Sequence, residues 1–233
     1  MANNRRAAHP GIWAVIPIKE TVLAKQRLAA ELSPHLRQEL ALAMFEDVLT
    51  AVAAVPEFSG IAVVTIDPDA AEIARRWGAE VWTDGAREGH TGAVSAAAGR
   101  LAAMSSAMLT IPGDVPLVTP ADIERVLAAH LPVPAFTIVP AWDERGSNTV
   151  VCSPADLVPL RFGSDSFFPH LAAARAQGVT PTVVRNDAIA LDFDEPSDLI
   201  RLYKRCSTSR TLALLHKYRA EWSRESVAAL ETQ

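Results

Sequence analysis

Three aspartates occupy positions from which they could bind a metal ion. Asp114 follows an apolar run of strand length. Asp192 lies on a strand expected over 188–193 and Asp194 directly follows that strand, where continued alternation places both on the same side. Mg²⁺ takes few protein oxygens and shares the rest of its coordination with phosphates, so carboxylates at strand ends suit it. The other interpretations are a turn hydrogen bond for Asp114 and a helix cap for one of the later pair. Asp198, in the first turn of the next helix, complements the helix dipole instead.

Basic residues follow the first apolar run of the chain. Lys19, Lys25 and Arg27 stand in one short segment. Ammonium and guanidinium groups, together with the backbone amides of a loop, can surround a polyphosphate. A solvated basic turn before a helix is the other interpretation, and the spacing of the residues does not decide between them.

Two loops rich in glycine and hydroxyl groups form a third candidate site. Ser147 lies in the first loop, and Gly163 and Ser166 lie in the second, which opens a helix. The N-terminus of a helix can bind an anion, and glycine lets the backbone approach a ligand closely. As purely structural features the loops are a hairpin turn and a helix cap. His170, just beyond them, could be a packed or a catalytic histidine.

Several classes of protein are excluded by composition or by missing motifs. The chain of 233 residues has a net charge of −5, which argues against binding to nucleic acid through a basic surface. No GxGxxG, P-loop, HExxH or GxSxG motif is present, and no apolar run reaches the ~20 residues of a membrane span. Two cysteines are too few for a disulfide scaffold and point to a reducing cytoplasm.

The elements that must position these residues alternate between strand and helix. Expected strands are 12–18, 60–65, 79–82, 107–111, 135–139, 149–152, 182–185 and 188–193. Expected helices are 33–52, 67–78, 91–104, 119–130, 166–177, 196–206 and 210–230. This order predicts an α/β protein with a mostly parallel sheet covered by helices and a partly antiparallel second half. Ligands of such sheets bind at the carboxyl ends of the strands.

Three parts are expected along the chain. Residues 1–10 are polar and predict a disordered N-terminus, 11–206 form one α/β domain, and 207–233 form a helical C-terminal tail.

Taken together, the motifs resemble those of the CofC/FbiD family of guanylyltransferases, which act on phospho-acids in the biosynthesis of coenzyme F-420. The matching segments are VIPIKETVLAKQRL, LAMFEDVL, IPGDVPLVTPADI, DERGSNTVV, RFGSDSFFPHLAAARAQG and IALDFDEPSDL, which together extend over residues 12–202. The resemblance implies that residues 11–206 are a nucleotidyltransferase domain with the nucleotide-diphospho-sugar transferase fold, a Rossmann-like, GT-A-type arrangement of three layers. A mostly parallel mixed sheet lies between helices on both faces in that fold.

The resemblance also assigns roles to individual residues. Lys25 and Asp114 are expected to be catalytic, and Mg²⁺ is expected on Asp114, Asp192 and Asp194. The residues expected to bind the nucleotide are Pro17, Lys19, Lys25, Arg27, Gly89 and Thr91. The residues expected to bind the phospho-acid are Ser147, Gly163 and Ser166.

The implied reaction is in-line attack by the phosphate of a three-carbon acid on the α-phosphorus of GTP, with release of pyrophosphate. Phosphoenolpyruvate, 3-phospho-D-glycerate and 2-phospho-L-lactate are the candidate acids. The attacking oxygen is already ionised at neutral pH, so alignment and charge neutralisation suffice and no general base is needed. The implied partners are these substrates and a downstream transferase that receives the product, with a homodimer left open. Neither nucleic acid nor a membrane is expected.

Two departures from the family pattern keep alternatives open. Gly89, His90 and Thr91 stand where members commonly carry Gly-Leu-Asn, and Ser147 stands in a Gly-Thr-Asn motif. One alternative is a related nucleotidyltransferase that acts on a sugar phosphate or a molybdopterin-type cofactor. A glycosyltransferase would usually carry a second carboxylate where Pro116 stands. A non-catalytic nucleotide-binding domain would be expected to lose the aspartates.

Overall fold

The computed structural model describes residues 11–130, 133–203 and 209–218. The strands are β1 (Ile12–Pro17), β2 (Phe58–Val64), β3 (Glu80–Trp82), β4 (Ala107–Thr110), β5 (Ala135–Pro140), β6 (Ser147–Ser153) and β7 (Thr182–Val183). The α-helices are α1 (Pro34–Ala53), α2 (Pro68–Arg76), α3 (Gly89–Ala103), α4 (Pro120–Ala128), α5 (Phe167–Ala176), α6 (Asp187–Ala190), α7 (Pro196–Tyr203) and α8 (Arg210–Lys217). Short 3₁₀ turns lie at η1 (Thr21–Leu23), η2 (Gln26–Leu28) and η3 (Ala86–Glu88).

All seven strands form one mixed sheet in the order β3-β2-β1-β4-β6-β5-β7. The first four are parallel, β6 runs antiparallel to both β4 and β5, and β7 is parallel to β5. The prediction of a mostly parallel sheet with a partly antiparallel second half is therefore confirmed. Because β1 and β4 are parallel neighbours, the loops that follow them leave the same edge of the sheet side by side.

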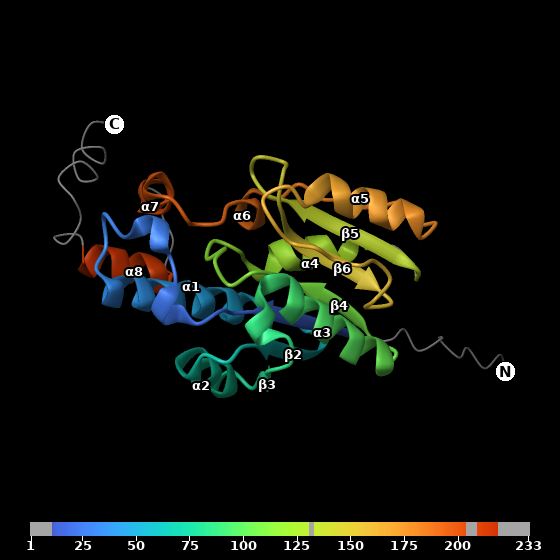
Figure 1. Ribbon diagram of the computed structural model, residues 1–233, viewed down its shortest axis with the longest axis horizontal. Helices are drawn as coiled ribbons and strands as arrows, with labels where there is room; N and C mark the ends of the chain where they lie inside the picture. The colour runs from blue at the N-terminus through green and yellow to red at the C-terminus, as the bar shows by residue number, and fades with distance from the viewer. Residues whose placement is uncertain (1–10, 131–132, 204–208, 219–233) are drawn as a thin grey trace.

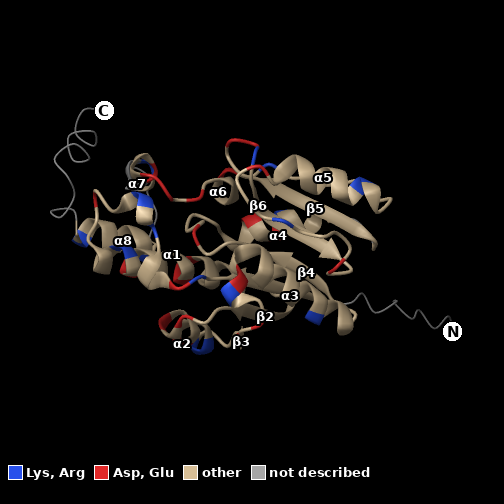
Figure 2. Ribbon diagram, in the orientation of Figure 1, with Lys and Arg blue, Asp and Glu red and all other residues tan. Residues whose placement is uncertain are grey.

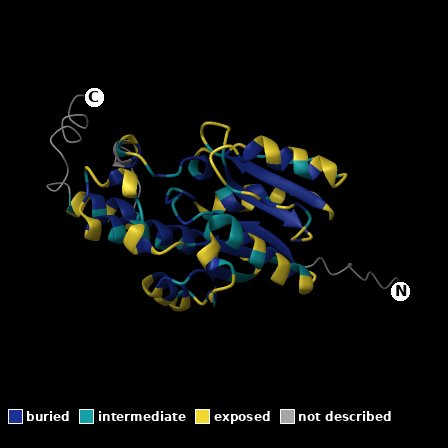
Figure 3. Ribbon diagram, in the orientation of Figure 1, coloured by how far each residue is buried: buried dark blue, intermediate teal, exposed yellow. Residues whose placement is uncertain are grey.

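Helices cover both faces of this sheet, which gives the three expected layers (Figure 1). Side chains alternate along β1: Ala14 and Ile16 face a cluster built with α1, α2 and α4, whereas Val15 faces a cluster built with α3 and α5. Figure 3 shows the central strands as mostly buried and the outer surfaces of the helices as exposed. The charged residues lie mainly on the loops and helices and leave the central strands uncharged (Figure 2).

Local sequence signals explain where three of these helices begin. Ser33, Asp67 and Thr119 each accept a hydrogen bond from a backbone N–H in the first turn, and each is followed by proline at the first helical position. The side-chain oxygens satisfy amides that have no partner within the helix, and proline has no N–H to leave unpaired there. The predicted starts of these helices are confirmed.

The segment that carries the last two aspartates differs from the prediction. We expected a strand over 188–193, but Asp187–Ala190 form the short helix α6, and Asp192 lies in the irregular chain that follows. The side chain of Asn186 accepts hydrogen bonds from the N–H groups of Ala188 and Ile189, which favours a helical turn over an extended strand. Period-two alternation therefore does not govern the relative orientation of Asp192 and Asp194.

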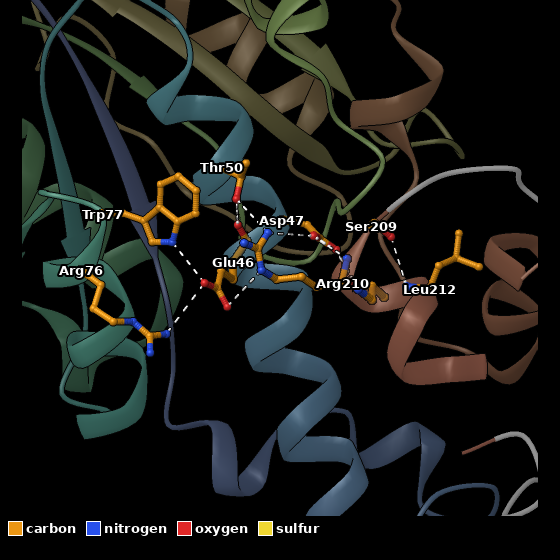
Figure 4. A network of polar contacts seen from close by, with 9 residues as sticks. Glu46, Asp47, Thr50, Arg76, Trp77, Ser209, Arg210 and Leu212 are labelled. Carbon is orange, nitrogen blue, oxygen red and sulfur yellow. Dashed lines mark hydrogen bonds and ion pairs between the residues drawn. The ribbon is translucent and has the colours of Figure 1, made fainter. Parts of the chain in front are cut away.

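The C-terminal helix α8 lies against α1, far from it in the sequence (Figure 4). The buried carboxylate of Asp47 accepts hydrogen bonds from Arg210 N at 2.9 Å, Thr211 N at 2.9 Å and Thr211 Oγ1 at 2.6 Å. The Arg210 guanidinium pairs with Glu46 and lies over the ring of Trp77. The helix expected over 210–230 is confirmed as far as Lys217. The rest of it and the expected disorder of residues 1–10 fall outside the described residues, and the division at residue 206 stays a prediction.

Candidate functional site

A cavity of about 630 Å³ opens at the carboxyl ends of β1 and β4. Its walls come from the loop after β1, the loop after β4, the start of α3 and the segment before α7. Gly113 lets the two loops meet, because a Cβ atom at this position would overlap with the side chain of Ile18. This is the edge of the sheet at which an α/β fold binds its ligands.

Lys25 connects the two acidic segments inside this cavity. Its ammonium lies 2.9 Å from Asp114 Oδ2 and 2.7 Å from Asp194 Oδ1, and only 6 % of its side chain is exposed. The Lys25 backbone has φ 52°, the left-handed conformation that costs energy for a residue with a Cβ. The surrounding loop maintains this conformation, which aims the ammonium at both carboxylates.

Phe193, the residue between Asp192 and Asp194, is held in place by a backbone hydrogen bond and by packing in the core. The Phe193 side chain is fully buried in a cluster that includes Leu28 and, from α8, Leu215. Leu28 belongs to the segment after β1 that carries Lys19 and Lys25 (residues 18–28), which we call the lysine loop. Phe193 N donates to the carbonyl of Asp114 at 3.3 Å, which joins the two acidic segments directly. Asp198 accepts hydrogen bonds from the N–H groups of residues 194 and 195, so it caps the start of α7, in line with its expected structural role.

The electrostatics of the cavity follow from these contacts. Burial opposes the charge on Asp114, but the adjacent Lys25 ammonium outweighs it and lowers the pKa of the carboxyl group. Burial likewise opposes the charge on Lys25, and the carboxylates of Asp114 and Asp194 raise its pKa nonetheless. Burial and the charges of Asp114 and Asp194 raise the pKa of Asp192 to about 6, because the opposite effect of the Lys25 charge is smaller there. At neutral pH the bridge consists of one ammonium between two carboxylates.

The donor set fits a divalent cation that shares its ligands with a substrate. Among the described residues, no three His, Cys, Asp or Glu side chains are arranged to hold a metal ion on their own. Asp114 and Asp194 nevertheless converge on one point, where they both contact Lys25. Mg²⁺ is usually bound by one or two carboxylates together with phosphate oxygens. This pair would supply the protein's share of such a site.

The residues predicted to bind the nucleotide divide into two groups. Pro17, Lys19, Lys25 and Gly89 line the cavity. Arg27 and Thr91 are not part of its lining. The exposed Arg27 guanidinium pairs with Glu195 at 3.0 Å, and Thr91 Oγ1 accepts a hydrogen bond from Phe162 N at 2.9 Å. The roles of all six residues toward the nucleotide stay predictions.

The residues predicted to bind the phospho-acid lie outside the lining of that cavity. Ser147 and Ser166, whose hydroxyl oxygens are 3.3 Å apart, form a cluster with His170, whose Nδ1 lies 3.0 Å from Ser147 Oγ; we call these three residues the serine cluster. All three side chains are buried, whereas Gly163 is exposed and has open space where a Cβ atom would stand. Burial lowers the pKa of His170 to about 4, so its ring is neutral at pH 7.

Aromatic rings connect the serine cluster to the cavity. The ring of Phe162 stacks on His90, which lines the cavity, with centroids 4.3 Å apart. The same phenylalanine meets His170 edge-on at 5.2 Å. Sequence reasoning singled out His90 only as a departure from a motif, because nothing in the local pattern shows that residues 90 and 162 are in contact.

The sequence pattern also did not indicate two further residues that position the site, because their contacts are with residues far away along the chain. Asp67 Oδ2 accepts hydrogen bonds from both the N–H and the hydroxyl of Thr21, each at 2.7 Å, and so fixes the lysine loop. The Asn148 side chain donates to the carbonyls of Ile189 and Ala190, at 2.8 and 3.0 Å, just before the acidic segment. For Asp67 the helix-cap pattern was the one sequence signal that could have drawn attention to it.

Comparison with known proteins assigns this chain to a family. The family model described as "Guanylyl transferase CofC like" matches residues 12–233. The chain belongs to this family.

Curated members of the CofC-like family differ in the acid that their names give. A phosphoenolpyruvate guanylyltransferase of Roseiflexus castenholzii is 37% identical over 191 residues, 82% of this chain and 87% of the relative. A 3-phospho-D-glycerate guanylyltransferase of Colwellia psychrerythraea is 33% identical over 185 residues, 79% and 88% of the two chains. A 2-phospho-L-lactate guanylyltransferase of Methanothermobacter thermautotrophicus is 32% identical over 186 residues, 80% and 81% of the two chains.

Solved structures support the same fold. A protein of Desulfovibrio desulfuricans described as a candidate nucleotide-diphospho-sugar transferase superposes with a TM-score of 0.71 at 20% identity, over 91% of this chain and 96% of that one. The expected nucleotide-diphospho-sugar transferase fold is therefore confirmed. Within the described part of this CofC-like chain, no helix combines the length and the apolar character needed to cross a membrane.

Proposed function

We propose that this protein transfers the GMP moiety of GTP to the phosphate of a three-carbon phospho-acid and releases pyrophosphate. The observation that carries the proposal is the Lys25 ammonium, buried between Asp114 and Asp194 in a cavity at the ends of β1 and β4. Membership in the guanylyl transferase family supports the type of reaction. We place the reaction in the biosynthesis of coenzyme F-420, in the cytoplasm, with the product passed to a downstream transferase.

The chain's own residues account for binding and alignment. Asp114 and Asp194, with Asp192 beside them, would hold Mg²⁺, which neutralises phosphate charge when bound. Lys25 and Lys19 place positive charge in the same cavity, where the triphosphate's negative charge needs compensation. The attacking phosphate oxygen is ionised at neutral pH, so the site needs no general base and acts by positioning and electrostatics.

The structure constrains the acid substrate and its binding site less than it constrains the site of the nucleotide. We propose Ser147, Gly163 and Ser166 as the binding site of the acid, because Ser166 stands at the N-cap position of α5, the buried hydroxyl of Ser147 lies 3.3 Å from that of Ser166, and an open glycine precedes the helix. Phosphoenolpyruvate and 3-phospho-D-glycerate are the acids to test first. Relatives of similar identity are named for different acids, so identity alone does not choose among them.

The test is pyrophosphate release from purified protein with Mg²⁺, four nucleoside triphosphates and the three phospho-acids. We expect activity with GTP and with one acid well above the others. Asp114→Asn keeps the size of the side chain but removes its charge, and should lower kcat about a hundredfold or more. Asp69→Asn, an exposed aspartate on α2, is the matched control and should leave kcat unchanged. Activity confined to sugar phosphates, or near wild-type turnover of Asp114→Asn, would refute the proposal.

A further inference from the structure

His170 has one hydrogen-bond partner at each ring nitrogen, and one of these partners fixes the position of the ring proton. The backbone N–H of Arg161 donates to His170 Nε2 at 2.9 Å. A backbone N–H can only donate, so Nε2 carries no proton. The ring is 1 % exposed and neutral at pH 7, hence its one proton lies on Nδ1. The partner of Nδ1 is Ser147 Oγ at 3.0 Å, which therefore accepts this proton.

This tautomer determines what the Ser147 hydroxyl can do. A serine oxygen has two lone pairs and one proton. The Nδ1–H group of His170 occupies one lone pair, so the Ser147 proton cannot be donated to the ring. The hydroxyl oxygens of Ser147 and Ser166 lie 3.3 Å apart, and because a hydroxyl proton can rotate, either serine can donate to the other. In both cases one of the two hydroxyl protons of this pair has no acceptor among the described residues, although Ser147 and Ser166 are only 8 % and 4 % exposed. A buried donor without a partner costs free energy unless a ligand accepts from it.

We propose that His170 is a positioning residue that makes the hydroxyl pair of Ser147 and Ser166 an obligate donor to an anionic oxygen of the acceptor acid. The inference rests on the proposed function, because it takes the serine cluster as the binding site of the acid. It adds the direction of the hydrogen bonds, from Arg161 N–H through the ring to the hydroxyl pair and on to the ligand. A carboxylate or phosphate oxygen, which only accepts, matches a pair that has one hydroxyl proton left to donate.

Two substitutions separate the two hydrogen bonds of the ring. In His170→Asn the amide nitrogen can take the place of Nδ1 and donate to Ser147, while the bond from Arg161 N is lost. In His170→Gln the longer side chain can accept from Arg161 N with its oxygen, while the donor to Ser147 is lost. Each variant gives up one hydrogen bond, so both should lower Tm. We expect the KM of the acid to rise about tenfold in His170→Gln, with rescue toward the wild-type value in His170→Asn and the KM of GTP unchanged in both.

A second histidine supplies the control for simple destabilisation. His130 also has a pKa lowered by burial to about 4, and its ring nitrogens lie 2.9 and 2.8 Å from Thr137 Oγ1 and Ser153 Oγ. It belongs to neither the cavity lining nor the serine cluster. His130→Gln should therefore lower Tm without changing the KM of the acid. A KM that follows Tm across all three histidine variants would overturn the positioning role.

The failure of this inference can be told apart from failure of the proposed function. If Ser147→Ala leaves the KM of the acid unchanged, the acid binds elsewhere and the proposed acceptor site is wrong. If Ser147→Ala raises that KM and His170→Gln does not, the acceptor site stands and the role of His170 is refuted. The nitrogen-15 NMR spectrum of the unmodified protein tests the tautomer without any substitution. A proton on Nδ1 of His170 is expected at pH 7, and a proton on Nε2 would overturn the inference.

Discussion

Replacing Lys25 with methionine tests the central contact of the cavity. Methionine keeps the length of the side chain and removes the charge, so the variant leaves Asp114 and Asp194 facing each other without the ammonium between them. We expect lower stability, a lower kcat, and a stronger stabilisation by Mg²⁺ than in the wild-type protein. The last effect is the most specific, because a divalent cation can take over the neutralising role of the ammonium.

The expected loss of stability in Lys25→Met follows from the two distances between the ammonium and the carboxylate oxygens. The carboxylate oxygens lie 2.9 and 2.7 Å from the ammonium. Their separation is no more than the sum, about 5.6 Å, at which two unit charges repel by about 3 kcal/mol with an effective dielectric constant of about 20. Asp114 and Asp194 are 32% and 43% exposed, so solvent screening reduces this to about 1–2 kcal/mol. With the two lost hydrogen bonds, we expect a loss of about 2 kcal/mol and a Tm lower by about 4–8 °C.

The assay is thermal unfolding with and without saturating Mg²⁺. Lys25→Met should regain most of its lost stability with Mg²⁺, and the wild type should gain less. Arg27→Met is the matched control: its ion pair with Glu195 is exposed, so its removal should change stability by less than about 0.5 kcal/mol. Equal Mg²⁺ shifts in wild type and Lys25→Met would refute the reasoning. The reasoning would also be refuted if Mg²⁺ still raised Tm more than in the wild type after Asp194→Asn is added to Lys25→Met.

Three other predictions concern the acceptor loop, the C-terminal helix and pH. Gly163→Val has no neighbour within 4 Å to clash with, so we expect normal folding, weaker binding of the acid and unchanged binding of GTP in paired titrations; equal losses would place the acid elsewhere. Asp47→Ala removes three hydrogen bonds to α8 and should cost about 3 kcal/mol in denaturant unfolding. It should also raise the Mg²⁺ requirement through the Phe193 cluster, and unchanged Mg²⁺ dependence would argue against that coupling. The pKa of His130 is about 4 in the fold against 6.5 ordinarily, so its neutral form contributes stability above pH 6.5 that is lost as pH falls towards 4. The loss is up to about 3 kcal/mol, absent in His130→Gln, and a pH-independent difference between the two proteins would contradict it.

The order and class of most elements could be predicted from local patterns. Apolar runs of strand length marked the central strands, and the Ser-Pro, Asp-Pro and Thr-Pro pairs marked the starts of α1, α2 and α4. These signals are local because capping and side-chain alternation involve residues only a few positions apart. The strand expected over 188–193 failed because the Asn186 side chain stabilises a helical turn there, and an apolar run by itself fits either element.

The sequence by itself determined which chemistry is available: aspartates, a lysine loop and hydroxyl-rich loops near the ends of elements. Only the tertiary structure decided how they combine. It placed Lys25 between Asp114 and Asp194, 89 and 169 positions away along the chain, and it brought His170 Nδ1 to 3.0 Å from Ser147 Oγ. The physical reason is that a hydrogen bond or an ion pair depends on distances of about 3 Å, which the packing of the sheet and its helices sets and which no local pattern encodes.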